Sequence, residues 1–358
     1  MNKHLLAAAA LAALGSTSAF AADMPLKAPP IAAASGNWYF WVDGMYENVR
    51  LPSYGLGIHG IGDASFLDLG PAQTFNQTLN GGGVRGALGY TMPGSGIRFE
   101  VGGSYVSAKG SSSQTSTLIN DAAPILLSGA NPGSAIVGSF LCAGIQGFTC
   151  TAAGTLSASY DAWQINGKIA VDRRFGAATI SPSLAVFGGN THNDQNLSQA
   201  FTQFLAGATF HSGTYSASTA LRWTDAGARA GLDLSVPVTG ALTFALGGWV
   251  GGASRTVSLS GSDVSHFSIA IFNGTSTVSA GDSRGVLLAN AEVGLAYAIN
   301  PIVTLRGFGG LDYDGSVPGV VGPSLTGNIG TPTARTPAGI GYAAETSYYA
   351  GGGFAARF

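Results

Sequence analysis

Charged side chains that could bind a solute or an ion recur at alternate positions within short apolar segments of the sequence. In residues 97–107, for example, Arg98 and Glu100 alternate with large apolar residues. A repeat of two residues is typical of a β-strand, because successive side chains of a strand point to opposite faces. Twelve charged residues lie at such positions: Asp43, Glu47, Arg85, Arg98, Glu100, Lys168, Asp172, Arg229, Asp233, Glu292, Arg306 and Asp312. Five are basic and seven are acidic, so they could pair with one another or line a polar passage.

Histidines offer a second, weaker candidate for chemistry. His192 and Asp194 lie two residues apart, and His59, His211 and His266 lie in other polar stretches. General-base catalysis needs a partner placed within hydrogen-bond reach, and the sequence identifies none. No Gly-Lys-Ser or Gly-Lys-Thr follows the glycine runs, so a phosphate-binding loop is not predicted. We therefore expect no enzymatic activity, no cofactor and no metal site.

The two cysteines, Cys142 and Cys150, lie eight residues apart in one polar, glycine-rich stretch. For an exported protein in an oxidising compartment, this spacing favours a disulfide within a loop. Two free thiols are the alternative. A metal site is less favoured, because no histidine lies near them in the sequence.

The elements that must position the charged residues are ten alternating segments. They are residues 38–47, 83–90, 97–107, 163–172, 179–187, 218–234, 242–250, 287–298, 303–313 and 347–358. We expect a bulge at Pro182, which cannot donate to a sheet ladder. We expect a second bulge near Thr224, because the apolar residues before and after it have opposite parity.

The connections between these segments alternate between long polar stretches and short ones that carry Pro or Gly. The longest runs from Lys109 to about Gly154. Long loops on one side, short turns on the other and an even strand number are typical of bacterial outer-membrane barrels. Residues 38–358 are thus predicted to form an all-β, transmembrane, antiparallel up-and-down β-barrel of ten strands. Twelve strands are the main alternative, using the hairpin signal Asn273-Gly274 or a pair hidden in the cysteine stretch, and eight is a further alternative.

The N-terminus and the composition agree with export and a lipid environment. Residues 1–21 combine Lys3, an apolar run and a small-residue cleavage site, as in a signal peptide. Residues 22–37 form a Pro- and Ala-rich periplasmic leader. Charged residues are only 9 % of the chain, against about 25 % in soluble domains. A formal net charge of −2 gives no electrostatic case for nucleic acid.

The leader Ala22-Asp23-Met24-Pro25-Leu26-Lys27-Ala28-Pro29-Pro30, the glycine-rich alternating strands and the terminal Phe358 together resemble the opacity-type outer-membrane β-barrel proteins of Gram-negative bacteria, particularly the alphaproteobacterial group. The resemblance implies a location in the cell outer membrane, surrounded by its lipid. It also implies assembly by the barrel insertion machinery, which in such proteins reads an aromatic C-terminal residue, here Phe358. Members of this group are surface antigens, adhesins or narrow porins, so the resemblance leaves the function open.

We expect the inward charges to pair and fill the interior, with a charged pore constriction as the alternative. The interior of an eight-stranded barrel is filled by its own side chains, whereas a barrel of sixteen or more strands leaves a channel. A ten-stranded barrel is close in size to the filled one. The predicted function is therefore porin-like passage of small hydrophilic solutes or a structural role in the outer membrane. A surface adhesin or antigen that binds host-surface ligands through its loops is the alternative. A protease at the outer rim, similar to the omptins and using His192, is the least favoured one.

Overall fold

The computed structural model describes residues 37–56, 58–59, 65–66, 73–118, 121–122, 148–268, 273–322, 324–328, 331–336 and 338–358. The signal peptide and nearly all of the leader predicted from the sequence lie outside these residues. The strands are β1 (Trp38–Leu56), β2 (Ile58–His59), β3 (Ser65–Phe66), β4 (Gln73–Thr91), β5 (Ile97–Leu118), β6 (Asp121–Ala122), β7 (Phe148–Val171), β8 (Arg173–Phe175), β9 (Ala178–Leu205), β10 (Ala208–Pro237), β11 (Leu242–Phe267), β12 (Gly274–Ala298), β13 (Val303–Val321), β14 (Ser324–Asn328), β15 (Thr331–Thr336) and β16 (Gly339–Arg357). Within the described part of the chain, no helix is long and apolar enough to span a membrane.

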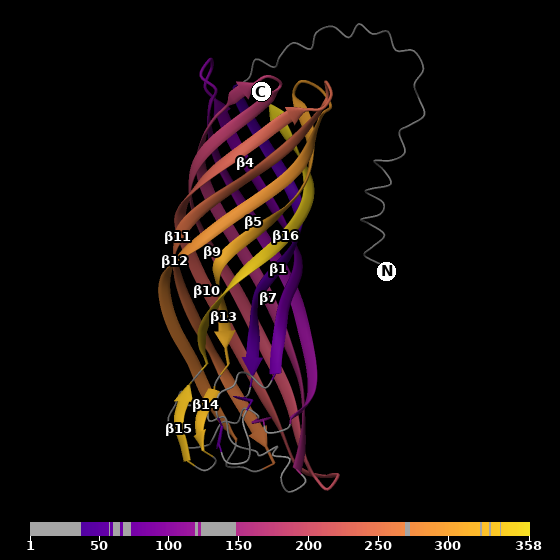
Figure 1. Cartoon of the computed structure of the whole chain (residues 1–358), viewed down its shortest axis with the longest axis vertical. Coiled ribbons are helices and arrows are strands. Elements are labelled where there is room, and N and C mark those ends of the chain that lie inside the picture. Colours follow the sequence, from indigo (N-terminus) through magenta and orange to yellow (C-terminus); the bar gives the residue numbers. More distant parts are fainter. Residues whose placement is uncertain are drawn as a thin grey trace, which may run out of the picture. The chain divides into compact units, whose positions relative to one another are not determined.

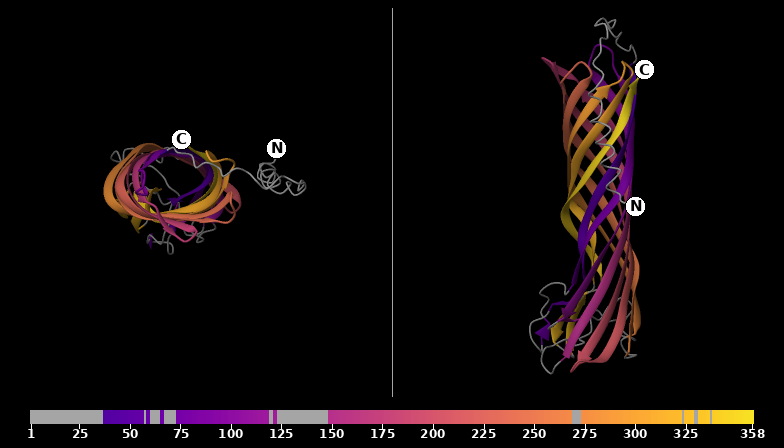
Figure 2. Two further views of the ribbon diagram at one scale, coloured as in Figure 1. Left: turned by 90° about the horizontal axis from the view of Figure 1, so that it is seen from above. Right: turned by 90° about the vertical axis from the view of Figure 1, so that its right-hand side faces the viewer.

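The long strands form one antiparallel sheet that closes on itself (Figures 1 and 2). Its order is β10-β11-β12-β13-β16-β1-β4-β5-β7-β9-β8, and a further pairing of β9 with β10 completes the ring. The last strand pairs with the first, with Asp43 opposite Gly353. The chain therefore forms an all-β, up-and-down ring. A three-stranded sheet of β15, β14 and β3 and a two-stranded sheet of β2 and β6 are separate from it.

The eleventh strand of the ring sheet, β8, is a continuation of β7. It pairs only with β9, with Arg173 opposite Ile180, and the β7–β9 ladder ends with Ala170 opposite Ser183. Both pairs share one register, so the two ladders are one ladder interrupted opposite Pro182. Proline has no N–H to donate, which explains the gap. The bulge predicted at Pro182 is therefore an interruption without a shift of register.

All ten segments predicted from alternation are strands, but the strands continue well into the predicted polar loops. Strand β10, for example, has 30 residues, and β9 has 28. The stretch from Thr191 to Thr214, predicted as a loop, is a hairpin that turns at Ala206 and Gly207, both with positive φ. The arm after Asn273-Gly274 is the beginning of β12. Of the stretch after Lys109, residues 119–120 and 123–147 lie outside the described residues.

The ring has two distinct ends. We call the end with the short β4–β5, β8–β9, β10–β11 and β12–β13 turns the turn end; β1 begins there and β16 ends there, joined by the backbone hydrogen bonds of Trp38 with Phe358. We call the opposite end the loop end. Figure 1 shows the long strands running from one end to the other. We call the corresponding halves of the barrel the turn half and the loop half.

In the turn half, the outward side chains are apolar. They include Trp38, Val42, Tyr46, Val84, Leu88, Phe99, Val101, Tyr105, Trp163, Ile165, Ile169, Leu184, Val186, Leu232, Leu246, Val250, Leu287, Val293, Leu295, Tyr297, Leu305, Leu311, Tyr348 and Phe354, all exposed. Aromatic rings mark both edges of this apolar belt. Trp38 and Tyr90 stack at 5.0 Å at the edge near the turn end. Tyr105 and Trp163 lie opposite each other at the other edge.

In the loop half, the alternation is reversed, with polar side chains outside and apolar ones inside. Along β10, Leu232 is 55 % exposed, whereas Leu221 is 0 % exposed. The pairings of β10 with β9 and β11 run through Thr224 without a shift of register. The bulge predicted near Thr224 is therefore wrong, because the environment of the two faces changes along the strand while the strand itself stays regular.

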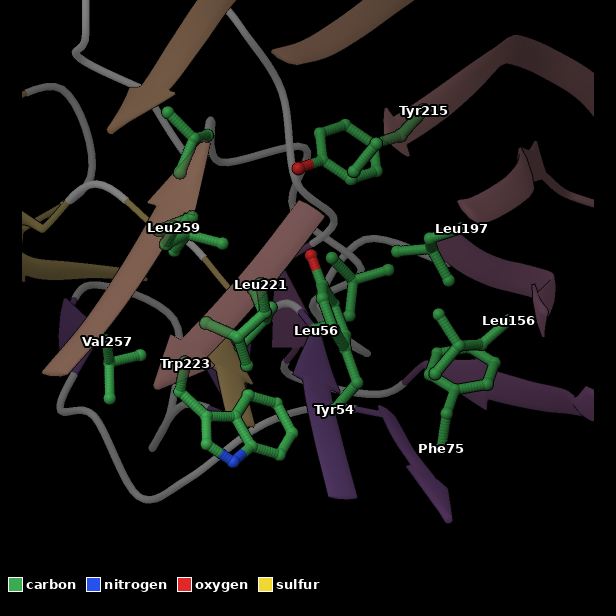
Figure 3. Packing of buried hydrophobic residues seen from close by; sticks show 14 residues of the cluster. Tyr54, Leu56, Phe75, Leu156, Leu197, Tyr215, Leu221, Trp223, Val257 and Leu259 are labelled. Carbon is green, nitrogen blue, oxygen red and sulfur yellow. The ribbon is translucent and has the colours of Figure 1, made fainter. Parts of the chain in front are cut away.

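The reversal fills the loop half with an apolar core. Its side chains come from strands all around the ring and meet inside it, among them Tyr54, Phe75, Leu156, Leu221 and Leu259 (Figure 3). A second cluster, with Val49, Leu79 and Val106, lies beside it. Fully burying a side chain of this size stabilises a fold by about 1.5–3 kcal/mol. The loop half is thus held together like the core of a water-exposed domain.

Candidate functional site: the charged interior of the turn half

The twelve charged residues singled out from the sequence all lie on the face opposite the apolar belt. Four of them meet in one network. Arg85 Nε lies 3.2 Å from Asp43 Oδ2, and Arg85 Nη1 lies 2.7 Å from Glu292 Oε2. Arg306 Nη1 approaches the same Asp43 oxygen at 3.6 Å. The network joins β1, β4, β12 and β13 through the inside of the ring.

Residues on neighbouring strands make this network possible. Asp43 is 0 % exposed, and the residue opposite it, Gly353, leaves the room for its carboxylate. A Cβ at Gly353 would collide with Asp43 and with the Val42 carbonyl oxygen. The Arg85 guanidinium also lies 4.1 Å from the centre of the Phe308 ring. A buried carboxylate held by two guanidiniums fixes the register of the strands around it.

Two more ion pairs between residues singled out from the sequence lie nearer the turn end. Arg98 Nε lies 2.9 Å from Asp172 Oδ1, which also accepts a hydrogen bond from Ser181 Oγ at 2.7 Å. Lys168 Nζ lies 3.1 Å from Asp233 Oδ2. The second pair joins β7 to β10 across the intervening β9. Eight of the twelve predicted residues therefore take part in ion pairs inside the ring.

The other four predicted residues have no ion pair among the described residues. Glu100 accepts hydrogen bonds from Tyr39 Oη and Trp41 Nε1. Asp312 accepts one from Asn290 Nδ2 at 2.8 Å. Arg229 donates to Gln164 Oε1 at 3.2 Å and lies 4.6 Å from the centre of the Trp249 ring. Glu47 has no hydrogen-bonding partner among the described residues.

The sequence reasoning missed the most deeply buried cation, Arg255. Both Asp225 oxygens accept hydrogen bonds from it at 2.7 Å, and Arg255 Nη2 lies 2.8 Å from Asp314 Oδ2. Arg255 is 2 % exposed. It was missed because the predicted strand ended at Val250, where the outward apolar residues stop. The alternation continues beyond that point with its polarity reversed, and this was the signal that could have found it.

A cavity of about 380 Å³ lies inside the ring among these groups. Its wall includes all four predicted residues that form no ion pair among the described residues: Glu47, Glu100, Arg229 and Asp312. Aromatic residues complete it, among them Trp41, Tyr160, Trp223 and Trp249. Side chains of the apolar core, including Leu51 and Val106, form its boundary toward the loop end. The cavity is therefore a polar and aromatic chamber on the turn-end side of the apolar core.

Among the described residues of the loop half, Asp263 is a buried carboxyl group without a cation beside it. Asp263 is 1 % exposed, and its oxygens lie among Tyr54, Tyr215 and other core side chains of the described chain. Burial raises the pKa of Asp263 to about 6, and the neighbouring Tyr215 hydroxyl offsets this only in part. The sequence did not single out Asp263, since it lies in a stretch without outward apolar residues.

The remaining predicted residues lie away from the cavity. Cys150 is disulfide-bonded, and Cys142 lies outside the described residues. His192 and Asp194 are exposed on the outer face of β9. Phe358 is exposed, and its ring lies 6.3 Å from that of Phe40 on the outside of the ring. His192 therefore does not face the inside of the barrel, where the other candidate groups lie.

Comparisons with known proteins find similar solved structures, all at low sequence identity. No protein-family model matches the sequence, and no curated protein matches it. Among solved structures, the chain is similar to the outer-membrane protease OmpT from Escherichia coli, with 12 % identity, 93 % of this chain and 99 % of that chain covered, and a TM-score of 0.41. It is also similar to a mutant of the monoaromatic hydrocarbon channel TodX, with 10 % identity, 91 % of each chain covered and a TM-score of 0.25. An anion-selective porin from Comamonas acidovorans has 12 % identity over 90 % of this chain and 98 % of that chain, with a TM-score of 0.16.

Proposed function

We propose that this protein is an integral outer-membrane β-barrel whose ten long strands cross the membrane. The apolar belt supports this proposal, since only a closed ring can present unbroken strand ladders to lipid. The aromatic rings at its two edges match the interfacial girdles of such barrels. In this orientation the turn end faces the periplasm, and the loop half stands outside the cell.

We propose further that the barrel is closed and that its role lies at the cell surface, where the loop half presents polar strands and loops to ligands. The observation that carries this proposal is the apolar core inside the loop half, with Leu221 0 % and Leu259 2 % exposed. Water and ions do not pass a close-packed apolar interior. The ion pairs in the turn half obstruct the same path a second time.

Conductance in planar bilayers tests the closed barrel against porin-like passage. Purified full-length protein should give no current steps in 1 M KCl at protein loads at which a general porin gives many. Regular steps of uniform size would instead favour the passage of small solutes. Truncation of the core by Leu221→Ala serves as the matched variant, and it should leave the bilayer silent because the other side chains of the apolar core still fill the ring.

A binding experiment tests the surface role. Residues 123–147 are replaced by a short Gly-Ser linker, which keeps the described parts of β5 and β7. The parent for this comparison carries Cys142→Ala and Cys150→Ala, so that the loss of the disulfide is matched. The parent in outer-membrane vesicles should bind to host cells or matrix glycans, and the linker variant should lose at least half of that binding. No binding by the parent would argue for a purely structural role.

A further inference from the structure

The cavity inside the turn half contains charges of both signs that other lumen charges do not neutralise. Of the lumen-facing cations among the described residues, Arg85, Arg98, Lys168, Arg255, Arg284 and Arg306 each form an ion pair with a carboxylate. Arg229 is the exception. Its guanidinium donates to an amide, Gln164, and faces the rings of Phe187 and Trp249.

Four carboxylates of the same cavity, Glu47, Glu100, Asp312 and Glu345, are likewise without an ion pair within the described part of the chain, and Glu100 differs from the others in accepting hydrogen bonds from Tyr39 and Trp41. Glu47 comes from β1 and Asp312 from β13, and the two groups repel each other electrostatically. Asp312 attracts Arg229, yet the two do not form an ion pair. A guanidinium and a carboxylate thus face each other across the chamber at more than contact distance.

The ring places these charges on different walls. Strand β10, which carries Arg229, is five strands away from β1 in either direction around the ring of ten long strands. Glu47 and Arg229 therefore approach the cavity from opposite sides. Aromatic side chains also line the cavity, among them Trp41 on β1 and Trp249 on β11. Rings of this kind exclude water and favour the apolar part or the cationic head of a ligand.

We propose that this cavity binds a small zwitterion, a molecule with one ammonium and one carboxylate group such as an amino acid. The carboxylate of the ligand pairs with the guanidinium of Arg229, which Gln164 Oε1 holds in place by accepting a hydrogen bond from it. The ammonium group lies between Glu47 and Asp312, beside the aromatic rings. A ligand with a single charge would pair either with Arg229 or with the carboxylates of Glu47 and Asp312, and it would leave the other charge unpaired. Unpaired charges in an enclosed site are energetically costly. The site goes beyond the surface role and does not depend on it.

The ligand reaches the cavity from the turn end, because the apolar core closes the other side. The pairs Lys168–Asp233 and Arg98–Asp172 lie on this path. Opening an ion pair that is partly exposed requires little energy, because water can replace its contacts. We therefore expect binding to be reversible.

Tryptophan fluorescence of the full chain in detergent tests the proposal, because Trp41 and Trp249 line the cavity. The probes are the ω-amino acids from β-alanine to 6-aminohexanoate, with hexanoate and hexylammonium as single-charge controls. At least one member of the series should give a saturable change, with a dissociation constant at least tenfold lower than either control. Arg229→Gln and Glu47→Gln should each weaken this binding at least tenfold. Arg174→Gln, an exposed cation at the turn end, is the matched control and should leave it unchanged.

Folding of each variant is checked by the shift in gel mobility between heated and unheated samples. If Arg229→Gln does not fold, Glu47→Gln and Asp312→Asn carry the test. The proposal is overturned if no zwitterion binds up to 50 mM, if hexanoate or hexylammonium binds as well as the series, or if the folded variants bind like the parent. None of these results would bear on the conductance of the barrel, so the two proposals fail separately.

Discussion

Single residues inside this barrel experience two different environments, and the charged ones show the difference best. Asp43 is fully buried in the turn half, where two guanidiniums neutralise it. Asp263 is equally buried in the loop half, where no described cation lies beside it. A buried carboxylate without a counter-charge takes up a proton more readily, because burial disfavours the charged form.

The pH dependence of stability should report on Asp263. Its pKa is about 6 in the folded protein and about 3.9 in an unfolded chain, so the folded state binds more protons between these values. Stability due to this group is therefore complete below about pH 4 and is lost as the pH rises through 6. Asp263→Asn should be more stable than the parent by about 2–3 kcal/mol at pH 7.5 and equally stable near pH 4. Denaturant unfolding in micelles at both pH values measures this, and an equal difference at the two values would contradict it.

Arg255 should be the most sensitive cation of the interior. Its guanidinium holds Asp225 and Asp314 while 2 % exposed, so its removal leaves two carboxylates without a counter-charge. Arg255→Met should cost about 3–5 kcal/mol in the free energy of unfolding. Arg222→Met, an exposed cation on the outer face of β10, is the control and should cost less than about 0.5 kcal/mol. Equal effects of the two variants in denaturant unfolding would show that the buried cluster is not a stabilising one.

At the scale of the element, a long strand of this barrel reverses the polarity of its two faces along its length. Along β10 the residues that face outward are alanine and leucine near the turn end and serine and arginine near the loop end. The inward face changes in the opposite sense, from Asp233 and Arg229 to Leu221 and Tyr215. Regular pairing is maintained through the change because the backbone ladder does not depend on the polarity of the side chains.

Single-cysteine labelling along β10 should reveal this change of environment. In the Cys142→Ala and Cys150→Ala background, Ser218→Cys should react quickly with a water-soluble maleimide, since position 218 is outward and exposed. Leu221→Cys should react slowly because its side chain is in the core, and Leu232→Cys because its side chain is in lipid. With a bulge near Thr224, Leu221→Cys would label like Ser218→Cys, which would contradict the regular strand described above.

At the scale of the whole molecule, a ring with an apolar belt outside and a half with an apolar core inside are stacked in one continuous sheet. In the proposed membrane location, the belt needs apolar residues outside, and the loop half needs them inside. Weakening the loop half should therefore leave the membrane ring intact. Leu221→Ala combined with Leu259→Ala should cost about 2–5 kcal/mol for each residue. Added protease should then cut β9 and β10 in the loop half and leave the rest of the barrel folded. Global unfolding without such cleavage would show that the two halves are one cooperative unit.

The charge alternation allowed the strand positions, the ring topology and the twelve inward charges to be predicted, because a period of two and a lipid-facing apolar stripe are local properties. The alternation of long and short connections also predicted which ends of the strands lie together. The sequence alone did not reveal that the predicted loops continue as strands, since there the polar residues face water on the outside and resemble a loop.

Only the tertiary structure decided which charges meet and which do not. Arg255 pairs with Asp314, which lies on a strand about sixty residues further along the chain. Arg229 pairs with no carboxylate of the described residues, although several lie nearby. Such pairings depend on strand register and on how far side chains reach across the ring, and neither is encoded in spacing along the chain. The same holds for the apolar core: its members are far apart in sequence, and only closure of the sheet brings them together. The sequence by itself therefore determined that a closed ring forms, and the tertiary structure decided that its interior is filled.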